Sequence, residues 1–383
     1  MSDLLVVESL PVWLPLTSPW LHQQILQLPE GITVRIVAER VENLDAFSHP
    51  NLRSLQDGKQ LRYVWDKGTR RLGLRDHLGL VASTCRRERA GVLHSHWGDW
   101  GWRDRGVSRR LGIPQVVTYY GKDVSFLPRR DPVWRERYAD LFRTVGRVLC
   151  EGPHMAERIV DLGCDPGRVA VHHLGVDVSA IEYRPRAWTP SVTLKVLIAA
   201  SFREKKGIPL ALEALGRLAA DVDLRVTIIG DASADPRSVV EKDRILTAAE
   251  PLGPRVAFLG YQSLGRLFEE AYAHHVFVSP SLTAADGDTE GGAPVSLIDM
   301  AATGMPIVSS THCDIPSVVL HGKTGLLASE GDVDGVESNL RWLIEHPSAW
   351  ETLVEAGRRH VEAEYDSRRL GRRLGEIYQE VAG

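Results

Sequence analysis

Short β-branched runs alternate with longer amphipathic stretches along the whole of this 383-residue chain. Such alternation is typical of βαβ units, in which parallel strands are joined through crossover helices. Strands are predicted at residues 32–38, 91–97, 114–120 and 147–150 and, further along, at 195–201, 224–230, 255–260, 275–280 and 306–310. We expect each set to form its own parallel sheet, so the predicted fold class is α/β.

Two domains are expected because 383 residues exceed what one hydrophobic core ordinarily organises. The segment 181–193 carries two prolines and little periodicity, so it is predicted to be the linker. The predicted domain limits are 1–185 and 192–365. Residues 366–383 have the pattern of a basic amphipathic helix with no strand after it, which predicts a cap on one sheet or a crossing back to the other domain.

The composition is that of a globular protein, with 25% charged and 43% hydrophobic residues and no apolar run near the roughly 20 residues that a membrane-spanning helix needs. The apolar N-terminus carries acids where a secretory signal carries Lys or Arg, so a cytoplasmic location is expected. Cys85, Cys150, Cys164 and Cys313 form no C-x-x-C pair, which predicts neither a zinc site nor a disulfide framework.

Basic residues are concentrated in the first half of the chain. Residues 1–190 carry 27 Lys and Arg against 22 Asp and Glu, whereas the remainder carries 19 against 28. Arginine pairs begin at positions 70, 86, 109 and 129. This half is therefore predicted either to face an anionic partner or to present an Arg-rich solvated surface.

The sequence DGDTEGGAPVSLIDM at 286–300 crowds three carboxylates against two glycines and an apolar run. Pro294 fits the first turn of a helix and Gly304 fits just past its end, so a helix is predicted at 293–303. Two glycines ahead of a helix let backbone N–H groups approach a ligand, and the positive end of the helix dipole favours an anion. The motif predicts a diphosphate site, although it is also compatible with a plain turn.

A basic segment, SFREKKG at 201–207, follows the predicted strand 195–201 and precedes a helix, which is where open α/β sheets bind ligands. Its cationic side chains are Arg203, Lys205 and Lys206. Phosphate held between a lysine and a helix N-terminus is a charge-assisted arrangement that stabilises a leaving diphosphate. Taken alone, the lysines are equally compatible with a solvated helix start.

Eight segments then follow one another along nearly the whole chain: LPLTSPWLHQQILQLP, HSHWG, TYYGKDVS, HHLGVD, ASFREKKGI, VAFLGY, EGGAPVSLIDMAATGMPIVSS and HGKTGLLASEGD. In these residues and in their order, the chain resembles the retaining glycosyltransferases of family 4. It is most similar to the branch that builds exopolysaccharides of the colanic-acid type. The resemblance implies a GT-B fold, with two Rossmann-like domains whose parallel sheets face a central cleft and a C-terminal helix that crosses between the domains.

The resemblance implies that the C-terminal half binds the donor. Gly291 and Gly292 would receive the donor diphosphate on their backbone, and Lys206 would neutralise it. Asp299 stands where the family usually has Glu and would accept hydrogen bonds from the donor ribose, while Glu290 resembles the acid that meets hydroxyls of the transferred sugar. The further implied donor contacts are Ser201, Arg203, Ala293, Pro294, Val295 and, near the nucleobase, Tyr261. Ordinary packing is the alternative for Tyr261.

Three positions depart from the family pattern. Eight residues separate Glu290 from Asp299 where family members commonly have seven, and the extra residue lies in the loop, which leaves the role of Glu290 open. The family arginine that partners the lysine would align with Ser201, so Arg203 is a displaced candidate. The family's TFHG histidine, which meets the donor sugar near the reacting carbon, is Tyr120 here.

His96 becomes the candidate imidazole because HSHW ends a predicted strand, where its ring would emerge at the carboxyl edge of the sheet. A structural role is the alternative, and His94 is expected in the interior of the strand. Asp123 is predicted either to orient a hydroxyl or to cap a helix.

Trp97, Trp100 and Trp102 are the acceptor candidates, since aromatic faces stack on sugar rings; core or lipid-facing packing is the alternative. The first domain of the family normally takes the acceptor. A lipid-linked acceptor carries phosphates at an anionic membrane surface, and the arginines of the first half would bind these anionic groups. This predicts a peripheral contact at the inner face of the membrane.

Asp286 and Asp288 also spell the D-x-D that metal-dependent, single-domain glycosyltransferases use. Lys206 and a helix N-terminus would make a metal redundant here, so neither a metal nor a cofactor beyond the donor is predicted. The predicted activity is metal-independent transfer of a hexosyl group, with retention, from a nucleoside diphosphate sugar to a carbohydrate, lipid-linked or small-molecule hydroxyl acceptor. Its catalytic candidates are Lys206, Glu290, His96 and Tyr120, and nucleic acid is not an expected partner.

Domain closure about residues 181–193 is expected to bring donor and acceptor together and to exclude water. Two alternatives remain open from the sequence. Another GT-B enzyme, such as a sugar-nucleotide epimerase or a phosphorylase, would share the fold. The replacement of the family histidine also allows a protein that binds a sugar nucleotide without turning it over, as the partner of an active enzyme.

Overall fold

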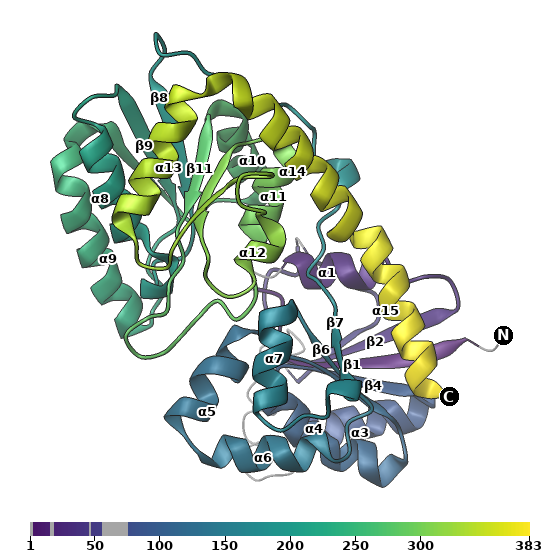
Figure 1. Cartoon of the computed structure of the whole chain (residues 1–383). Helices are drawn as coiled ribbons and strands as arrows, with labels where there is room; N and C mark the ends of the chain where they lie inside the picture. The colour runs from purple at the N-terminus through teal and green to yellow at the C-terminus, as the bar shows by residue number, and fades with distance from the viewer. Residues whose placement is uncertain (1–2, 16–18, 46, 56–75) are drawn as a thin grey trace. The chain divides into compact units, whose positions relative to one another are not determined.

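The computed structural model describes residues 3–15, 19–45, 47–55 and 76–383 (Figure 1). The first of the predicted arginine pairs, at 70 and 71, lies outside the described residues, as do residues 16–18 of the first family-like segment. Two compact units divide the chain: unit 1 comprises residues 1–175 and 367–383, and unit 2 comprises residues 176–366. Each unit is an α/β domain built on one parallel sheet.

Unit 1 has, among its described residues, a seven-stranded sheet in the order β3-β2-β1-β4-β5-β6-β7, with parallel pairing throughout. The strands are β1 (Leu4–Trp13), β2 (Ile32–Val41), β3 (Leu52–Ser54), β4 (Val92–His96), β5 (Gln115–Thr118), β6 (Arg147–Cys150) and β7 (Val169–Val171). The helices are α1 (Pro19–Leu26), α3 (His77–Glu88), α4 (Gly98–Leu111), η1 (Lys122–Phe126), α5 (Leu127–Arg130), α6 (Val133–Phe142), α7 (Pro153–Asp161), η2 (Pro166–Arg168) and α15 (Ser367–Ala382).

Strands β2, β4, β5 and β6 confirm the four predicted for this half of the chain. The interior strand β1 was not predicted, because Glu8 and Pro11 interrupt its apolar pattern. β4 pairs with β1 only through Val6–Ser9. Pro11, which has no N–H to donate, lies beyond that ladder and is therefore tolerated.

Helices cover both faces of this sheet. Leu374, Ile377 and Tyr378 of α15 pack on the face that carries Val6 and Val92. α3 and α4 pack on the opposite face. The last helix of the chain therefore belongs to unit 1, although the helix before it, α14 (Trp350–Glu364), belongs to unit 2.

Unit 2 has a six-stranded parallel sheet in the order β10-β9-β8-β11-β12-β13. The strands are β8 (Leu194–Ala199), β9 (Leu224–Ile229), β10 (Val256–Gly260), β11 (Val276–Ser279), β12 (Ile307–Ser310) and β13 (Leu326–Ala328). The helices are η3 (Val178–Ala180), η4 (Glu204–Lys206), α8 (Ile208–Leu218), α9 (Pro236–Ala249), η5 (Glu250–Arg255), α10 (Leu264–Ala273), α11 (Val295–Thr303), α12 (Ile315–Val318), α13 (Val333–Glu345), η6 (Pro347–Ala349) and α14. All five strands predicted for this half are confirmed, whereas β13, three residues long, was not predicted.

Two apolar layers sandwich the second sheet. α8, α9 and α13 pack on one face together with Trp350 and Leu353 at the start of α14, and α10, α11, α12 and the later part of α14 pack on the other (Figure 1). The strand order reverses between β8 and β11, since β9 and β10 extend the sheet from β8 in one direction and β12 and β13 extend it from β11 in the other. The segments that leave the carboxyl ends of β8 and β11 therefore border the switch point at which such sheets bind ligands.

The predicted linker, 181–193, contains no helix or strand, as expected. It is nevertheless anchored to unit 2, because the buried Arg186 guanidinium donates to the carbonyls of Thr303 and Ala271, both at 2.9 Å. Residues 176–185 also group with unit 2. The domain limits 1–185 and 192–365 stay predictions. No helix in the described ranges combines the length and the apolar character that crossing a bilayer requires.

Candidate functional site

The predicted glycine loop and its helix lie at the switch point of unit 2. α11 begins at Val295, two residues later than predicted, with Pro294 as its N-cap, and ends before Gly304 at a φ of 80°. Gly291 has a φ of 79°, a left-handed conformation that strains any residue with a Cβ. The backbone N–H groups that follow this glycine thus precede a two-turn helix with its positive end toward the loop.

The basic segment after β8 lies against this loop. Lys206 Nζ is 2.8 Å from Glu290 Oε1 and 2.9 Å from Oε2. The approach is close because Gly207 has no side chain: a Cβ there would lie 2.0 Å from the carbonyl oxygen of Pro280, just past β11. A backbone bond of 2.9 Å from the Leu282 N–H to the Lys205 carbonyl joins the two segments.

Cationic side chains neutralise each of the three loop carboxylates. Asp288 is 2.7 Å from Arg203 and 3.4 Å from Lys205, and Asp286 is 2.7 Å from Arg237. The D-x-D residues therefore have Arg and Lys partners. Arg203, the displaced candidate for the family arginine, lies beside the loop through this contact with Asp288.

Glu290 and Asp299 have opposite electrostatic environments. Burial of Glu290 disfavours its charge, but Lys206 and Lys205 outweigh burial and lower its pKa to about 2. Burial raises the pKa of Asp299 to about 7, and no charge or donor among the described residues opposes it. Glu290 is thus an ionised, paired carboxylate, whereas Asp299 is a buried carboxyl without a partner that lowers its pKa.

Three residues that the sequence analysis did not single out hold the loop. Ser281 donates its hydroxyl to Glu290 Oε1 at 2.8 Å, and the Glu290 N–H donates to His312 Nε2 at 3.1 Å. His312 Nδ1 is in turn 2.7 Å from Glu330. His312 lies two residues after the end of β12, and Ser281 lies two residues after the end of β11. Their positions just past strands of this sheet were the signal that could have identified them.

The remaining donor candidates lie around the same edge. Ser201 follows β8 and is partly buried, and its carbonyl accepts from the Arg203 N–H at 2.9 Å. Tyr261 follows β10 with 48% of its surface exposed, and Leu264 nearby is 49% exposed. An exposed aromatic ring at a strand end is available to a ligand, which the predicted base contact requires.

The histidines of unit 1 are buried. His96 is fully buried: its Nδ1 is 2.7 Å from the Tyr120 hydroxyl and its Nε2 is 2.8 Å from Glu8 Oε2. The ring does not emerge at the edge of the sheet as expected, because it lies on the face that α15 covers, where Tyr120 and Glu8 hold both of its nitrogens. His94 lies in the strand interior, as expected, and Tyr120 is 6% exposed.

Asp123 has a capping role. Its carboxylate accepts from the N–H of Gly98, the first residue of α4, at 2.6 Å and from the N–H of Tyr120 at 2.9 Å. Burial raises the pKa of Asp123 well above its usual range, although these two N–H groups favour the charged form. This contact at the start of α4 fits the predicted role of a helix cap better than the alternative role of orienting a hydroxyl.

The three acceptor candidates lie in different surroundings. Trp97 is partly buried and has a φ of 71°, an outlier for a bulky residue, and its ring centroid is 5.0 Å from that of Tyr120. Trp100 is buried and donates its indole N–H to His77, so it has a core position. Trp102 lies under the guanidinium groups of Arg105 and Arg137.

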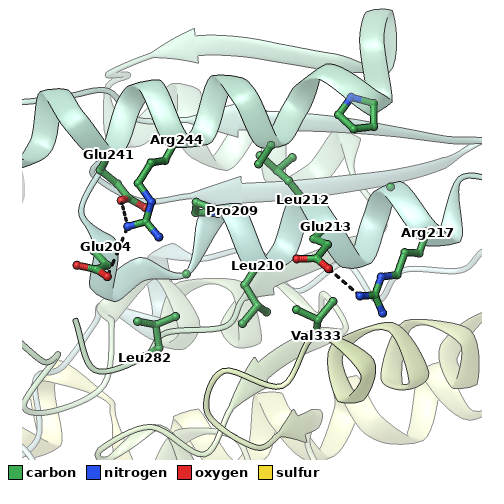
Figure 2. Close-up of a pocket in the computed structure, with 14 residues that line it drawn as sticks. Glu204, Pro209, Leu210, Leu212, Glu213, Arg217, Glu241, Arg244, Leu282 and Val333 are labelled. Carbon is green, nitrogen blue, oxygen red and sulfur yellow. Dashed lines mark hydrogen bonds and ion pairs between the residues drawn. The ribbon is translucent and has the colours of Figure 1, made fainter. Parts of the chain in front are cut away.

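A cavity of about 610 Å³ lies elsewhere in unit 2, along α8 and α9 (Figure 2). Its apolar lining includes Pro209, Leu210 and Val333, and the ion pair of Glu241 with Arg244 lies at its edge. None of the predicted donor residues lines it. The chemistry of the glycine loop, rather than the size of this cavity, therefore identifies the candidate site.

Two family models match the chain. The model described as Glycosyltransferase Family 4 matches residues 26–180, and the model described as glycosyl transferases group 1 matches residues 193–346. One model falls in each half, and together they span most of the sequence.

Relatives from polysaccharide synthesis support the same assignment. The chain is 29% identical over 302 residues to the putative colanic acid biosynthesis glycosyltransferase WcaL of Salmonella typhimurium, which is 76% of this chain and 71% of the relative. It is also 29% identical over 273 residues to the amylovoran biosynthesis glycosyltransferase AmsK of Erwinia amylovora, which is 70% of this chain and 64% of that protein. These relatives confirm the resemblance to the exopolysaccharide branch.

Solved structures share the fold across the whole chain. Anabaena HepE, solved in complex with UDP-glucose, aligns with a TM-score of 0.78 and 15% identity over 98% of this chain and 99% of that one. Sucrose-phosphate synthase from Thermosynechococcus elongatus aligns with a TM-score of 0.77 and 16% identity over 98% of each chain. With both halves matched by family models and the fold by these GT-B structures, the chain belongs to glycosyltransferase family 4.

Proposed function

We propose that this protein is a retaining, metal-independent glycosyltransferase that moves a hexosyl group from a nucleoside diphosphate sugar to a hydroxyl acceptor in polysaccharide or glycoconjugate synthesis. The observation that carries the proposal is the contact of Lys206 with Glu290, directly before Gly291 and the N-terminus of α11. One lysine, a run of main-chain N–H groups and a helix dipole are thereby brought to one place, where they complement a diphosphate.

The charge chemistry of the proposed reaction follows from this arrangement. As the bond from the anomeric carbon to the diphosphate breaks, negative charge grows on the leaving oxygen. Lys206 and the N–H groups after Gly291 stabilise that charge in the transition state more than in the ground state, and this difference accelerates the step. The diphosphate takes over part of the contact that Lys206 makes with Glu290. The Glu290 carboxylate then accepts hydrogen bonds from hydroxyls of the transferred sugar.

The nucleoside is held by two further residues in the proposal. The Asp299 carboxylate accepts hydrogen bonds from the ribose hydroxyls. These hydroxyls give the buried carboxylate the hydrogen-bond donors that it otherwise lacks. The exposed ring of Tyr261 contacts the base. UDP is the first nucleotide to test, since a protein of the same fold was solved with UDP-glucose.

The acceptor is proposed to bind unit 1. Trp97 is its leading aromatic contact, because it is partly buried and strained, whereas Trp100 is buried in the core. The relatives named for colanic acid and amylovoran support an acceptor on the route to an exopolysaccharide. A cytoplasmic location and a peripheral membrane contact through the Arg-rich half stay predictions from the sequence.

Binding is tested first, by thermal unfolding with UDP, GDP and ADP and with their sugars. A nucleotide present at 100 times its Kd stabilises the folded state by about 2.7 kcal/mol, so one base should raise Tm clearly above the others. Failure of every nucleotide to raise the Tm of the folded protein would reject the donor site.

Transfer is tested second, as release of nucleoside diphosphate with and without polysaccharide or lipid acceptor fractions. Release that depends on the acceptor, together with a product of retained anomeric configuration, is the expected result. Conversion of the donor without acceptor would point to another GT-B enzyme, such as an epimerase. Tight donor binding with no product from any fraction would support the non-catalytic partner instead.

A further inference from the structure

A cluster of polar side chains lies inside the apolar layer between the sheet of unit 1 and α15. Alternation along the strands places Glu8, His94 and His96 on the same face as Val6 and Val92, the face that α15 covers. The register pairs Glu8 of β1 with His94 of β4, so the three side chains are neighbours. Each is no more than 1% exposed.

The ligand atoms of the cluster converge on one point. Glu8 Oε2 is 3.0 Å from His94 Nδ1 and 2.8 Å from His96 Nε2. The hydroxyl of Tyr378 on α15 is 2.6 Å from His94 Nδ1 and 2.7 Å from Glu8 Oε1. Two imidazoles, a carboxylate and a phenol therefore face one another from two strands and the last helix.

The charge of this cluster is not balanced by a permanent cation. The contacts of the Glu8 carboxylate within the described ranges are two imidazoles and a phenol, with no Lys or Arg among them. Buried charges in proteins are paired or coordinate metals. Imidazole nitrogen and carboxylate oxygen are ligands that Zn²⁺ prefers, and four-coordinate sites closed to solvent are its structural mode.

We infer that Glu8, His94 and His96, with Tyr378 as the fourth ligand, form a structural Zn²⁺ site that fastens the C-terminal helix to the sheet of unit 1. Ligand atoms around tetrahedral zinc lie about 3.3 Å apart, so the contacts of 2.6 to 3.0 Å that join His94 to Glu8 and Tyr378 and Glu8 to His96 need to lengthen by only about 0.3 to 0.7 Å. The site would be closed and would have no open position for a substrate. It is separate from the loop carboxylates and independent of the proposed donor chemistry.

The outer nitrogens of both imidazoles have partners that suit a metal-bound state. His94 Nε2 is 2.7 Å from the Thr118 hydroxyl, and His96 Nδ1 is 2.7 Å from the Tyr120 hydroxyl. When the inner nitrogens bind the metal, each proton sits on the outer nitrogen and is donated to a hydroxyl oxygen. Such outer contacts fix the tautomer and orientation of metal-binding histidines.

The test measures metal in the full-length chain. The protein is unfolded in denaturant with chelator, refolded with Zn²⁺ or Co²⁺, desalted and analysed by mass spectrometry of the metal. About one metal ion per chain is expected, together with a Tm several degrees above that of the metal-free protein and the visible absorption of four-coordinate Co²⁺. Wild-type protein that refolds to native circular dichroism but retains no metal would overturn the inference, whatever the variants do.

Variants locate the metal. The double substitution His94→Gln/His96→Gln, and Glu8→Gln separately, should reduce the bound metal to a small fraction of one ion per chain. His77→Gln is the matched control, since His77 is also buried in unit 1 but packs on the opposite face against Trp100. It should retain the full metal content. Equal metal in the double variant and the wild type would place the ion elsewhere and contradict the site.

Discussion

The ammonium group of Lys206 and the carboxylate of Glu290 form a largely buried ion pair at 2.8 Å, at the end of the loop that leads into α11. The pair joins the segment after β8 to the segment after β11, the two strands that border the switch point of the sheet. In the proposed reaction, a donor diphosphate would compete with Glu290 for the lysine. In this proposal the same contact positions Lys206 to bind the phosphate and Glu290 to bind the sugar.

Lys206→Ala should lower the rate of transfer by about 100-fold to 1,000-fold, because it removes a charge that stabilises the leaving diphosphate. It should also lower the free energy of unfolding by about 3 kcal/mol, since Glu290 is left buried without its main partner. Adding Glu290→Gln should restore much of the stability but none of the activity. Steady-state kinetics and denaturant unfolding separate the two effects.

Lys242→Ala is the matched control for that change. Its partner, Asp231, forms an exposed pair in the same unit, so stability should fall by less than about 1 kcal/mol and transfer should not change. Unaltered donor affinity and rate in Lys206→Ala would contradict the proposed role of the lysine.

Asp299 should link donor binding to pH. Its pKa of about 7 means that the carboxyl is largely protonated in more acidic solution, whereas ribose hydroxyls donate best to the ionised form. Affinity for a nucleotide sugar should therefore rise as pH increases toward 7 and level off above it, by at most about tenfold per pH unit. Calorimetry with the nucleotide sugar measures this, since free nucleoside diphosphate titrates in the same range.

Asp299→Asn should bind the donor more weakly and with no such pH dependence. Burial raises the pKa of Asp299 from its ordinary value of 3.8 to about 7, so between these values the folded protein binds more protons than the unfolded protein. The free energy of unfolding that protonated Asp299 contributes is therefore lost as pH rises toward 7. The variant should be more stable than the wild type above pH 7, and a pH-dependent affinity that survives the substitution would assign the effect to another group.

Gly291→Ala should weaken diphosphate binding. Forcing a Cβ into its left-handed conformation costs about 1 to 2 kcal/mol and displaces the N–H groups that follow. Gly322→Ala is matched for strain, with a φ of 71° and open space around its Cβ. Both variants should lose similar stability in urea unfolding, but only Gly291→Ala should raise the Kd for the nucleotide; equal Kd values would remove the loop from the phosphate site.

Tyr261→Ala should raise the Kd for the nucleotide by about threefold to tenfold, the loss expected for one aromatic contact with the base. Leu264→Ala serves as its control, because that side chain is as exposed as Tyr261 but has no aromatic face. Thermal shift with the preferred nucleotide compares them. If the two variants bind equally well, Tyr261 has only a packing role.

The sequence by itself determined the alternation of strands and helices, the helix after the glycine loop and the family. These features are local: periodicity of 2 and 3.6 residues, a proline at a helix start and a glycine at its end leave a mark within a few positions. Strand β1 was not predicted, because Glu8 and Pro11 break its apolar pattern, although it pairs with β2 on one side and β4 on the other.

Only the tertiary structure decided which side chains meet. Sheet register brings Glu8 to His94 across 86 positions and α15 brings Tyr378 to both, while the turn after β8 pairs Arg203 with Asp288 and Lys206 with Glu290. It also buried His96, whose place at a strand end had suggested exposure. Contacts between distant residues depend on strand order and on which face of the sheet a neighbouring helix covers. Neither of these can be predicted from a short segment of the sequence.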